Sequence, residues 1–210
     1  MEQEQQNRVQ WVYGASDPDE LARRYDEWAK DYDADLDQDF GYLGPSLAAD
    51  YFAKYVPSNA HVLDAGAGTG LVGVELAGRG YADVNGLDLS QGMLAEARKK
   101  GVYGELRQMK LGETLDYRSG EFDAVISVGV LTLGHAPAAS LDELVRVTKS
   151  GGHVVFSLRP DVYARSGFKE KQEELEKAGL WRLVEVSDEV RIMPRGEPDV
   201  AHQVWVYRVA

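Results

Sequence analysis

The sequence predicts an α/β fold in which a doubly wound, mostly parallel sheet carries helices on both faces. Two observations support this prediction. Short apolar runs alternate with helical segments between residues 61 and 158, a pattern typical of parallel strands that are linked by helices. Two more apolar runs then follow with no helix between them. They indicate a closing hairpin, and therefore one antiparallel strand.

The composition limits the classes of protein to which the chain can belong. Its 210 residues are 44% hydrophobic and 28% charged, which is enough for one complete globular core. The absence of cysteine excludes disulfides, thiolate zinc sites and iron–sulfur clusters, and we expect no metal site. The net charge of −12 argues against nucleic acid or anionic lipid as a partner.

The chain shows no sign of a membrane or secretory segment. Its first residues are polar and acidic, unlike a signal peptide, and no apolar run approaches the roughly 20 residues of a membrane helix. We therefore expect a soluble, cytoplasmic protein, a monomer or weak homodimer.

Residues 1–56 are predicted to form a helical cap that precedes a core of residues 57–210. Within the cap, residues 1–16 are expected to be loose or to form a short docking segment. Residues 17–39 carry apolar side chains at three- and four-residue steps, which predicts an amphipathic helix. Residues 46–56 repeat that pattern. Asp17 and Pro18 are suitable for the N-cap and the first helical position.

The core is predicted to contain strands and helices in alternation, followed by the hairpin. The predicted strands are residues 61–65, 84–89, 106–111, 122–128, 153–158, 181–192 and 202–209. The helices are centred on residues 71–76, 93–97, 141–145 and 168–179.

A glycine-rich turn follows the first core strand and is the most informative part of the chain. Glycines at positions 66, 68 and 70 stand between a strand and a helix. Such a turn lets a ligand approach the backbone, and the helix start offers unpaired N–H groups. The predicted binding residues here are Asp64, Ala65, Gly66, Gly68, Thr69 and Gly70.

Asp88 ends the second core strand, where a carboxylate can accept hydrogen bonds from both hydroxyls of a ribose. Ser90 is the better N-cap for the next helix, which leaves Asp88 available to a ligand. Leu89 and Met93 follow it, and a thioether packs well against an aromatic ring such as adenine.

The same residues also permit a dinucleotide. Gly68, Gly70 and Gly73 satisfy G-x-G-x-x-G, and Asp88 lies 20 residues after Gly68, as in NAD-binding proteins. Asp64 argues against this alternative, because its carboxylate would repel a pyrophosphate but would suit a ligand that carries an ammonium group. The chain also lacks the Tyr-x-x-x-Lys pair of short-chain hydride-transfer enzymes.

Taken together, the motifs resemble those of the class I S-adenosylmethionine-dependent methyltransferases. The similarity spans residues 17–160, and the motifs that carry it are Tyr25–Asp33, Asp64–Gly70, Asp88–Leu94, Phe122–Val125 and Lys149–Gly152. It implies a Rossmann-like, seven-stranded sheet with a reversed last strand, S-adenosylmethionine as cofactor and S-adenosylhomocysteine as product.

The resemblance also assigns parts of the site. The glycine turn would surround the methionine part of the cofactor, and Asp88 would bind its ribose. The loop of residues 110–114, with Leu111 and Gly112, would lie near the adenine. Many relatives have an Asp-x-x-x-Leu-Pro loop there, which this chain lacks. Further cofactor-binding residues would be Tyr25, Trp28, Tyr32 and Val128, the first three on a helix that folds over the cofactor.

The resemblance predicts an enzyme that transfers a methyl group to an oxygen, nitrogen or sulfur atom of a small molecule. No Asn-Pro-Pro-Tyr follows the fourth core strand, which argues against amino groups of nucleic acids as acceptors. His135 follows that strand and is the candidate general base, while Arg159 follows the fifth and is suitable for a substrate carboxylate. An NAD(P)-dependent oxidoreductase and a cofactor-binding protein without catalysis are the alternative functions.

Overall fold

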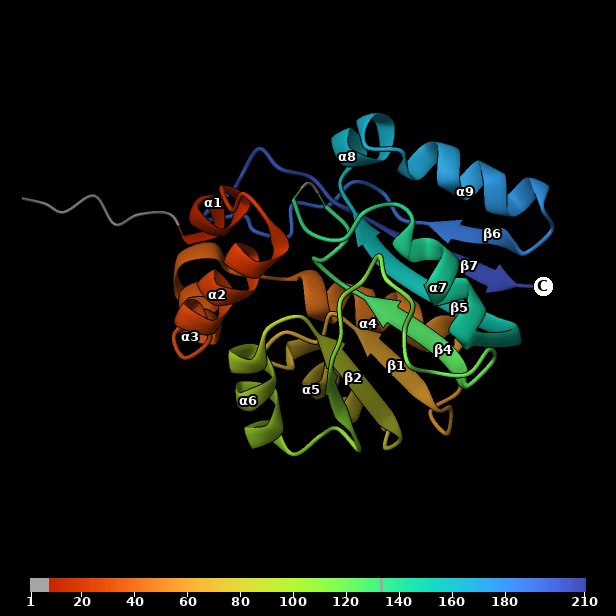
Figure 1. Cartoon of the computed structure of the whole chain (residues 1–210), viewed down its shortest axis with the longest axis horizontal. Coiled ribbons are helices and arrows are strands. Elements are labelled where there is room, and N and C mark those ends of the chain that lie inside the picture. Colours follow the sequence, from red (N-terminus) through yellow and green to blue (C-terminus); the bar gives the residue numbers. More distant parts are fainter. Residues whose placement is uncertain (1–7, 133) are drawn as a thin grey trace, which may run out of the picture.

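The computed structural model describes residues 8–132 and 134–210. Within them, seven strands form one sheet in the order β3-β2-β1-β4-β5-β7-β6 (Figure 1). The strands are β1 (Val62–Ala65), β2 (Val84–Asp88), β3 (Leu106–Gln108), β4 (Phe122–Ser127), β5 (Thr148–Leu158), β6 (Trp181–Val186) and β7 (Gln203–Val209). The first five run parallel, and β7 lies antiparallel between β5 and β6. The predicted doubly wound sheet with a reversed last strand is confirmed.

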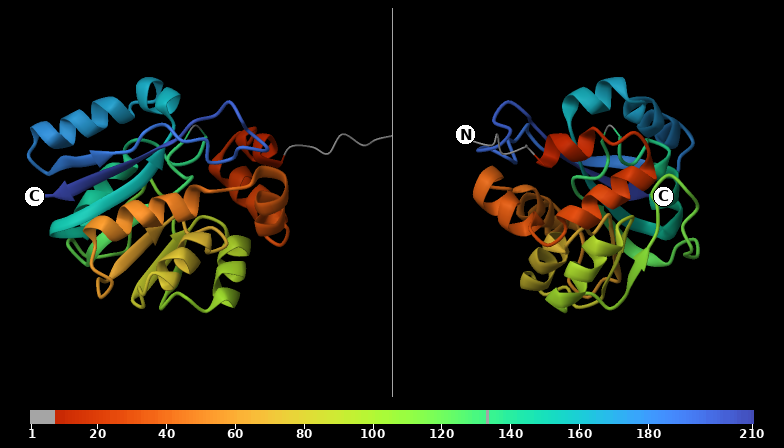
Figure 2. Two further views of the ribbon diagram at one scale, coloured as in Figure 1. Left: turned by 180° about the vertical axis from the view of Figure 1, so that it is seen from behind. Right: turned by 60° about the vertical axis from the view of Figure 1, so that its left-hand side comes forward.

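Helices cover both faces of this sheet (Figure 2). On one face, α4 (Gly44–Tyr55) and α5 (Leu71–Gly78) bury Phe52 and Leu76 against strands β1, β2 and β4. On the other, α7 (Ser140–Val147) and α9 (Phe168–Lys177) pack Leu144 and Leu175 against β4, β5 and β7. A further helix, α6 (Gln91–Lys100), follows β2, and the short α8 (Pro160–Arg165) follows β5. The sequence did not predict α8.

The remaining helices lie at the carboxyl ends of the parallel strands (Figure 1). They are α1 (Arg8–Tyr13), α2 (Pro18–Trp28), α3 (Tyr32–Asp35) and the π-helical turn η1 (Leu36–Phe40). Their apolar side chains form one cluster with Ile192 and Met193 from the loop between β6 and β7. Asp17 caps α2 through the backbone N–H of Glu20, and Pro18 begins the helix, as predicted.

The prediction of a single helix over residues 17–39 was wrong. Helix α2 ends at Trp28, and the rest of this segment consists of the short α3 and η1. Gly41 follows η1 and has a left-handed conformation. Aspartate occupies every second position from residue 31 to residue 39, and aspartate is a poor helix former because it competes for backbone hydrogen bonds. The Trp28 indole N–H donates to Asp35 at 2.7 Å, which fixes the bend.

The segment before α2 also differs from its prediction. Residues 8–13 are helical, with Val9 and Val12 buried, whereas residues 1–7 lie outside the described part of the chain. Burial of these two valines in the cluster with Met193 explains why a short polar segment is ordered there.

Two strands are shorter than predicted by more than one residue. The sixth ends at Val186, not at residue 192, and the loop that follows touches the sheet through the bridge between Val190 and His202. Ile192 is apolar because it packs under the N-terminal helices. The third strand ends at Gln108, since Leu111 turns into the core. No helix in the described part of the chain is long and apolar enough to cross a membrane.

Candidate active site

The glycine-rich turn between β1 and α5 forms the floor of the site. Gly66, Gly68 and Gly70 have φ angles of 96°, 54° and 92°, which glycine adopts without steric cost. A Cβ atom placed on Gly66 would lie 2.2 Å from Val130 Cγ2, whereas one on Gly68 would meet nothing within 4 Å. The backbone at Gly68 is therefore open to a ligand, close to the N-terminal end of α5, where the helix dipole favours a negatively charged group.

Asp88 stands at the end of β2 and faces this turn. Its Oδ2 accepts a hydrogen bond from Gly68 N at 2.8 Å, and its Oδ1 accepts one from Ser90 N at 2.9 Å. A carboxylate has about four acceptor positions, so capacity remains for the hydroxyls of a ligand. Burial raises the pKa of Asp88, and the backbone N–H groups of Ser90 and Gly68 oppose that effect. Ser90 caps α6 by accepting from Met93 N, as predicted.

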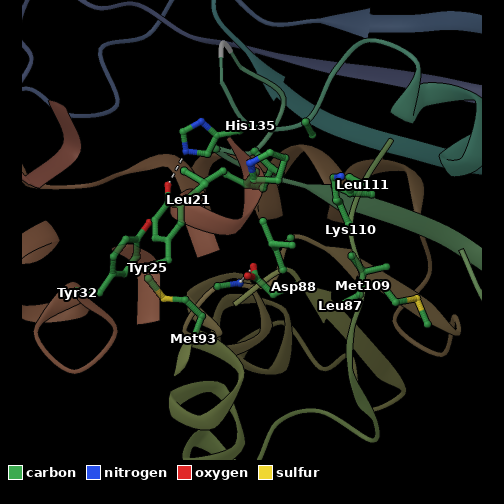
Figure 3. A pocket seen from close by; sticks show the side chains of 18 residues that line it. Leu21, Tyr25, Tyr32, Leu87, Asp88, Met93, Met109, Lys110, Leu111 and His135 are labelled. Carbon is green, nitrogen blue, oxygen red and sulfur yellow. Dashed lines mark hydrogen bonds between the residues drawn. The ribbon is translucent and has the colours of Figure 1, made fainter. Parts of the chain in front are cut away.

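Apolar side chains surround Asp88 and enclose a cavity of about 760 Å³, the open solvent at its mouth included (Figure 3). They come from the ends of β2, β3 and β4, from α2 and α6, and from the loops that follow the strands. The aliphatic and thioether side chains among them are Leu21, Leu87, Leu89, Met93, Met109, Leu111, Val128 and Val130. Apolar walls around one carboxylate suit a ligand with a flat ring and a sugar.

Tyr25 and Tyr32 line the outer side of the cavity, and His135 lies beside them (Figure 3). The Tyr25 hydroxyl and His135 Nε2 are hydrogen-bonded at 2.8 Å. Burial raises the pKa of both tyrosines well above the ordinary value, so their hydroxyls stay protonated at neutral pH. The predicted cap aromatics and the predicted base thus meet at one place.

Two acidic side chains connect α2 and α3 to the core through hydrogen bonds. Asp26 Oδ1 accepts hydrogen bonds from Gly92 N at 2.7 Å and from Ser90 Oγ at 2.5 Å. Asp33 accepts one from Lys100 Nζ at 2.6 Å and another from the Thr69 hydroxyl. Through these contacts, α2 and α3 are held against α6 and the glycine turn.

Asp64 lies beneath the turn and does not line the cavity. It is fully buried, its Oδ2 accepts from the Tyr103 hydroxyl at 2.7 Å, and its Oδ1 has no hydrogen-bond partner. Burial raises the pKa of Asp64 to about 7, the hydrogen bond from Tyr103 opposes this rise, and the charge of Asp88 adds to it. Its predicted contact with an ammonium group stays a prediction.

The predicted site residues fall into two groups, those that line the cavity and those that lie in the structure around it. Those that line the cavity are Tyr25, Tyr32, Gly66, Gly68, Asp88, Leu89, Met93, Leu111, Val128 and His135. Those that do not are Trp28, Asp64, Ala65, Thr69, Gly70 and Gly112.

Each residue of the second group has another position. Ala65 lies in the buried strand β1, and Thr69 donates to Asp33. Gly70 packs against Tyr103, and Gly112 against Pro137. Trp28 contributes to a neighbouring cavity.

Several residues that line the cavity, and one residue that supports it, were not predicted from the sequence. Leu21 shares a helical spacing with Tyr25 and was detectable from it, whereas Met109, Gly129 and Ala136 stand in loops without a repeating pattern. Tyr103 is the missed support. A Cβ atom on Gly73 would lie 2.3 Å from its ring, so this packing accounts for the third glycine of the dinucleotide-like pattern.

A second cavity of about 580 Å³, open solvent included, adjoins the first. Tyr25, Tyr32 and Gly129 line both. Its other walls come from α1, η1, the end of β5 and the loop before β7. Two ligands bound in the two cavities would therefore meet at a shared wall.

Comparison with known proteins identifies relatives over most of the chain. A family described as "Methyltransferase domain" matches residues 63–156. Methyltransferase-like protein 27 from Homo sapiens is 37% identical over 181 residues, which cover 83% of this chain and 73% of that protein. A ubiquinone biosynthesis O-methyltransferase from Alkalilimnicola ehrlichii is 35% identical over 117 residues, or 53% of this chain and 47% of that protein.

Solved structures support the fold alone. The crystal structure of the [4+2]-cyclase SpnF matches with a TM-score of 0.70 at 16% sequence identity, over 93% of this chain and 97% of that chain. The 37% identity to Methyltransferase-like protein 27 is evidence of family as well as of fold. It favours a methyl donor over a dinucleotide as the ligand of the glycine turn. The chain therefore belongs to the class I S-adenosylmethionine-dependent methyltransferases.

Proposed function

We propose that the protein transfers a methyl group from S-adenosylmethionine to an oxygen, nitrogen or sulfur atom of a small molecule. The observation that supports this most is the pair of adjoining cavities with Tyr25, Tyr32 and Gly129 in common. Methyl transfer is an in-line displacement, so the protein mainly has to align two ligands and exclude water. Helices α1 to η1 act as a cap over the carboxyl ends of the strands, whereas α4, which also belongs to the predicted cap of residues 1–56, packs against the sheet of the core of residues 57–210.

The larger cavity has the residue types that the cofactor needs. Asp88 would accept the ribose hydroxyls, and Met93 and Leu111 would flank the adenine. The methionine part of the cofactor would lie along the open backbone at Gly68. A tyrosine hydroxyl from the cap would contact the carboxylate of that methionine part. When bound, S-adenosylmethionine supplies an electrophilic methyl group on a sulfonium sulfur.

His135 is proposed as the general base for acceptors that arrive protonated. Its imidazole lies at the cavity wall and is oriented by the Tyr25 hydroxyl. The relative from Alkalilimnicola ehrlichii is named an O-methyltransferase, which supports oxygen as the acceptor atom.

Calorimetry separates this function from the dinucleotide alternative. S-adenosylmethionine and S-adenosylhomocysteine are expected to bind with dissociation constants in the micromolar range, roughly −8 kcal/mol, and NAD is expected to give no heat. Heat from NAD with none from either sulfur compound would overturn the proposal. His135→Gln should leave binding intact but lower kcat, whereas His153→Gln, in strand β5, should leave both unchanged. Binding without turnover across a broad acceptor panel would favour a cofactor-binding protein without catalysis.

A further inference from the structure

The walls of the second cavity indicate the shape of its ligand. Most of them are apolar or aromatic, including Val12, Trp28, Leu131 and Met193. The hydroxyl of Tyr42 also lies against this space, 2.9 Å from the position that a Cβ atom on Gly129 would take. Ligand sites of this kind bind an apolar body and orient it through a few polar groups.

Arg159 supplies a positive charge to this cavity. Among the described residues that line it, Arg159 is the one with a permanently charged side chain, and no carboxylate lines it. Asp161 fixes the guanidinium by accepting from Nε at 3.0 Å and from Nη2 at 2.9 Å. These bonds use two of the five N–H groups of an arginine. The Tyr13 hydroxyl interacts with the guanidinium as well.

The position of Asp161 leaves Arg159 with a capacity for another anion. The side chain of Asp161 is 49% exposed, whereas that of Arg159 is 22% exposed. The guanidinium is therefore the more buried partner of this pair, and Arg159 itself lines the cavity.

His202 provides a second, independent indication of a ligand. It is 6% exposed, and its Nδ1 has no hydrogen-bond partner. Burial lowers the pKa of His202 to about 4, and the charge of Arg159 acts in the same direction, so the imidazole is neutral at physiological pH. A buried polar atom without a partner is costly, and a polar group of a ligand in this cavity would offset that cost.

We infer that the second cavity binds a small aromatic or aliphatic carboxylic acid as the methyl acceptor, with its carboxylate held by Arg159. The inference rests on the proposed methyltransferase function. A carboxylate matches the planar guanidinium, an amine would be repelled by it, and a single arginine favours a monoanion over a phosphate dianion. The apolar body lies against Trp28 and the tyrosines, and a second group of the acid, a hydroxyl or a thiol, faces Gly129. Its oxygen or sulfur would bond to the methyl carbon as the carbon–sulfur bond of the sulfonium breaks, and its proton would pass to the proposed base, His135.

The test compares phenylacetate with phenylacetamide, which have nearly the same shape and differ in charge. Each is titrated by calorimetry into wild-type protein saturated with S-adenosylhomocysteine. The acid is expected to bind at least about tenfold more tightly than the amide, or roughly 1.4 kcal/mol. Equal affinity of the two probes overturns the inference without the need for any variant. So does the absence of binding by both probes, titrated from 20-fold the protein concentration up to about 50 mM.

Variants then assign the preference to the arginine. Arg159→Gln should abolish the preference for the acid, and Arg159→Lys should retain part of it, since lysine keeps the charge but loses the planar fork. Arg165→Gln, an equal loss of charge at the exposed last residue of α8, should retain it fully. A preference that survives in Arg159→Gln would contradict the inference.

Binding of S-adenosylhomocysteine is measured first in every protein and is expected to be unchanged. Its failure in the wild type would refute the proposed function itself. Normal binding together with equal affinity for acid and amide would refute only the carboxylate inference.

Discussion

Asp64 and Asp88 lie near the ends of adjacent parallel strands, but their surroundings give them different roles. Asp88 faces the cavity and holds the backbone of Gly68 and Ser90. Asp64 is sealed beneath the turn and bonded to Tyr103. One carboxylate is therefore available to the ligand, and the other supports the turn that carries it.

Replacement of Asp88 tests the direct role. Asp88→Ala is expected to weaken binding of S-adenosylhomocysteine by about 1.5–3 kcal/mol, the scale of hydrogen bonds to a charged acceptor. Circular dichroism should show an intact fold, because a carboxylate at the end of a strand is not part of the apolar core. The matched control is Asp116→Ala, whose side chain is 98% exposed. A dissociation constant equal to that of the wild type would limit Asp88 to a role in the turn.

Individual site residues were predictable where a local pattern marks them. Gly66, Gly68 and Asp88 stand at the ends of strands, and their spacing along the chain is informative. Tyr103 and His202 have no such pattern. Tyr103 meets Asp64 from 39 positions away, and His202 reaches the cavity because its loop folds under α1. These contacts depend on tertiary packing, which a single sequence does not encode locally.

At the scale of elements, the core was more predictable than the cap. Each core strand has an apolar run with glycine or polar residues after it, so its existence follows from periodicity. The cap helices are short and acidic, and they are stabilised by their shared apolar cluster and by contacts such as those of Asp26 with α6. Helices of this length are marginal without tertiary packing, which explains why their ends were misplaced.

The polar contacts that hold the cap against α6 and the glycine turn are few. We therefore expect the cap to open. Amide exchange in residues 8–40 is expected to be faster than in the central strands of the free protein, and slower when S-adenosylhomocysteine is bound. Closure of the aromatic face would then exclude water from the reacting methyl group. Hydrogen exchange followed by mass spectrometry measures both states.

A pair of variants sharpens this test. Asp26→Asn weakens the contact between α2 and α6 and should speed exchange in the cap, whereas Asp19→Asn, exposed on the same helix, should not. The burial of Trp28, which is 1% exposed, is compatible with a cap that never opens. Slow exchange of equal rate in the free and bound protein would show that the cap stays closed.

At the scale of the whole molecule, the sheet joins the site to global stability. Asp64 belongs to β1, which lies between β2 and β4 in the interior of the sheet. Because helices cover both faces there, exposure of this carboxylate to water requires the central strands to separate. Its ionisation is therefore linked to unfolding of the whole protein.

This linkage gives a pH dependence with a definite sign. The folded-state pKa of Asp64 is about 7, above the roughly 3.9 of an unfolded aspartate. The folded protein thus holds this proton more tightly, and the stability that it contributes is fully present below about pH 4 and lost as the pH rises towards 7.

Asp64→Asn keeps an oxygen for the Tyr103 hydroxyl but cannot ionise. Urea denaturation should show its stability relative to the wild type increasing by up to about 4 kcal/mol between pH 4 and pH 8, while Asp116→Asn, exposed to solvent, changes little. A difference between Asp64→Asn and the wild type that is independent of pH would mean that the pKa of Asp64 in the folded protein is that of an ordinary aspartate, and that its carboxylate is charged there.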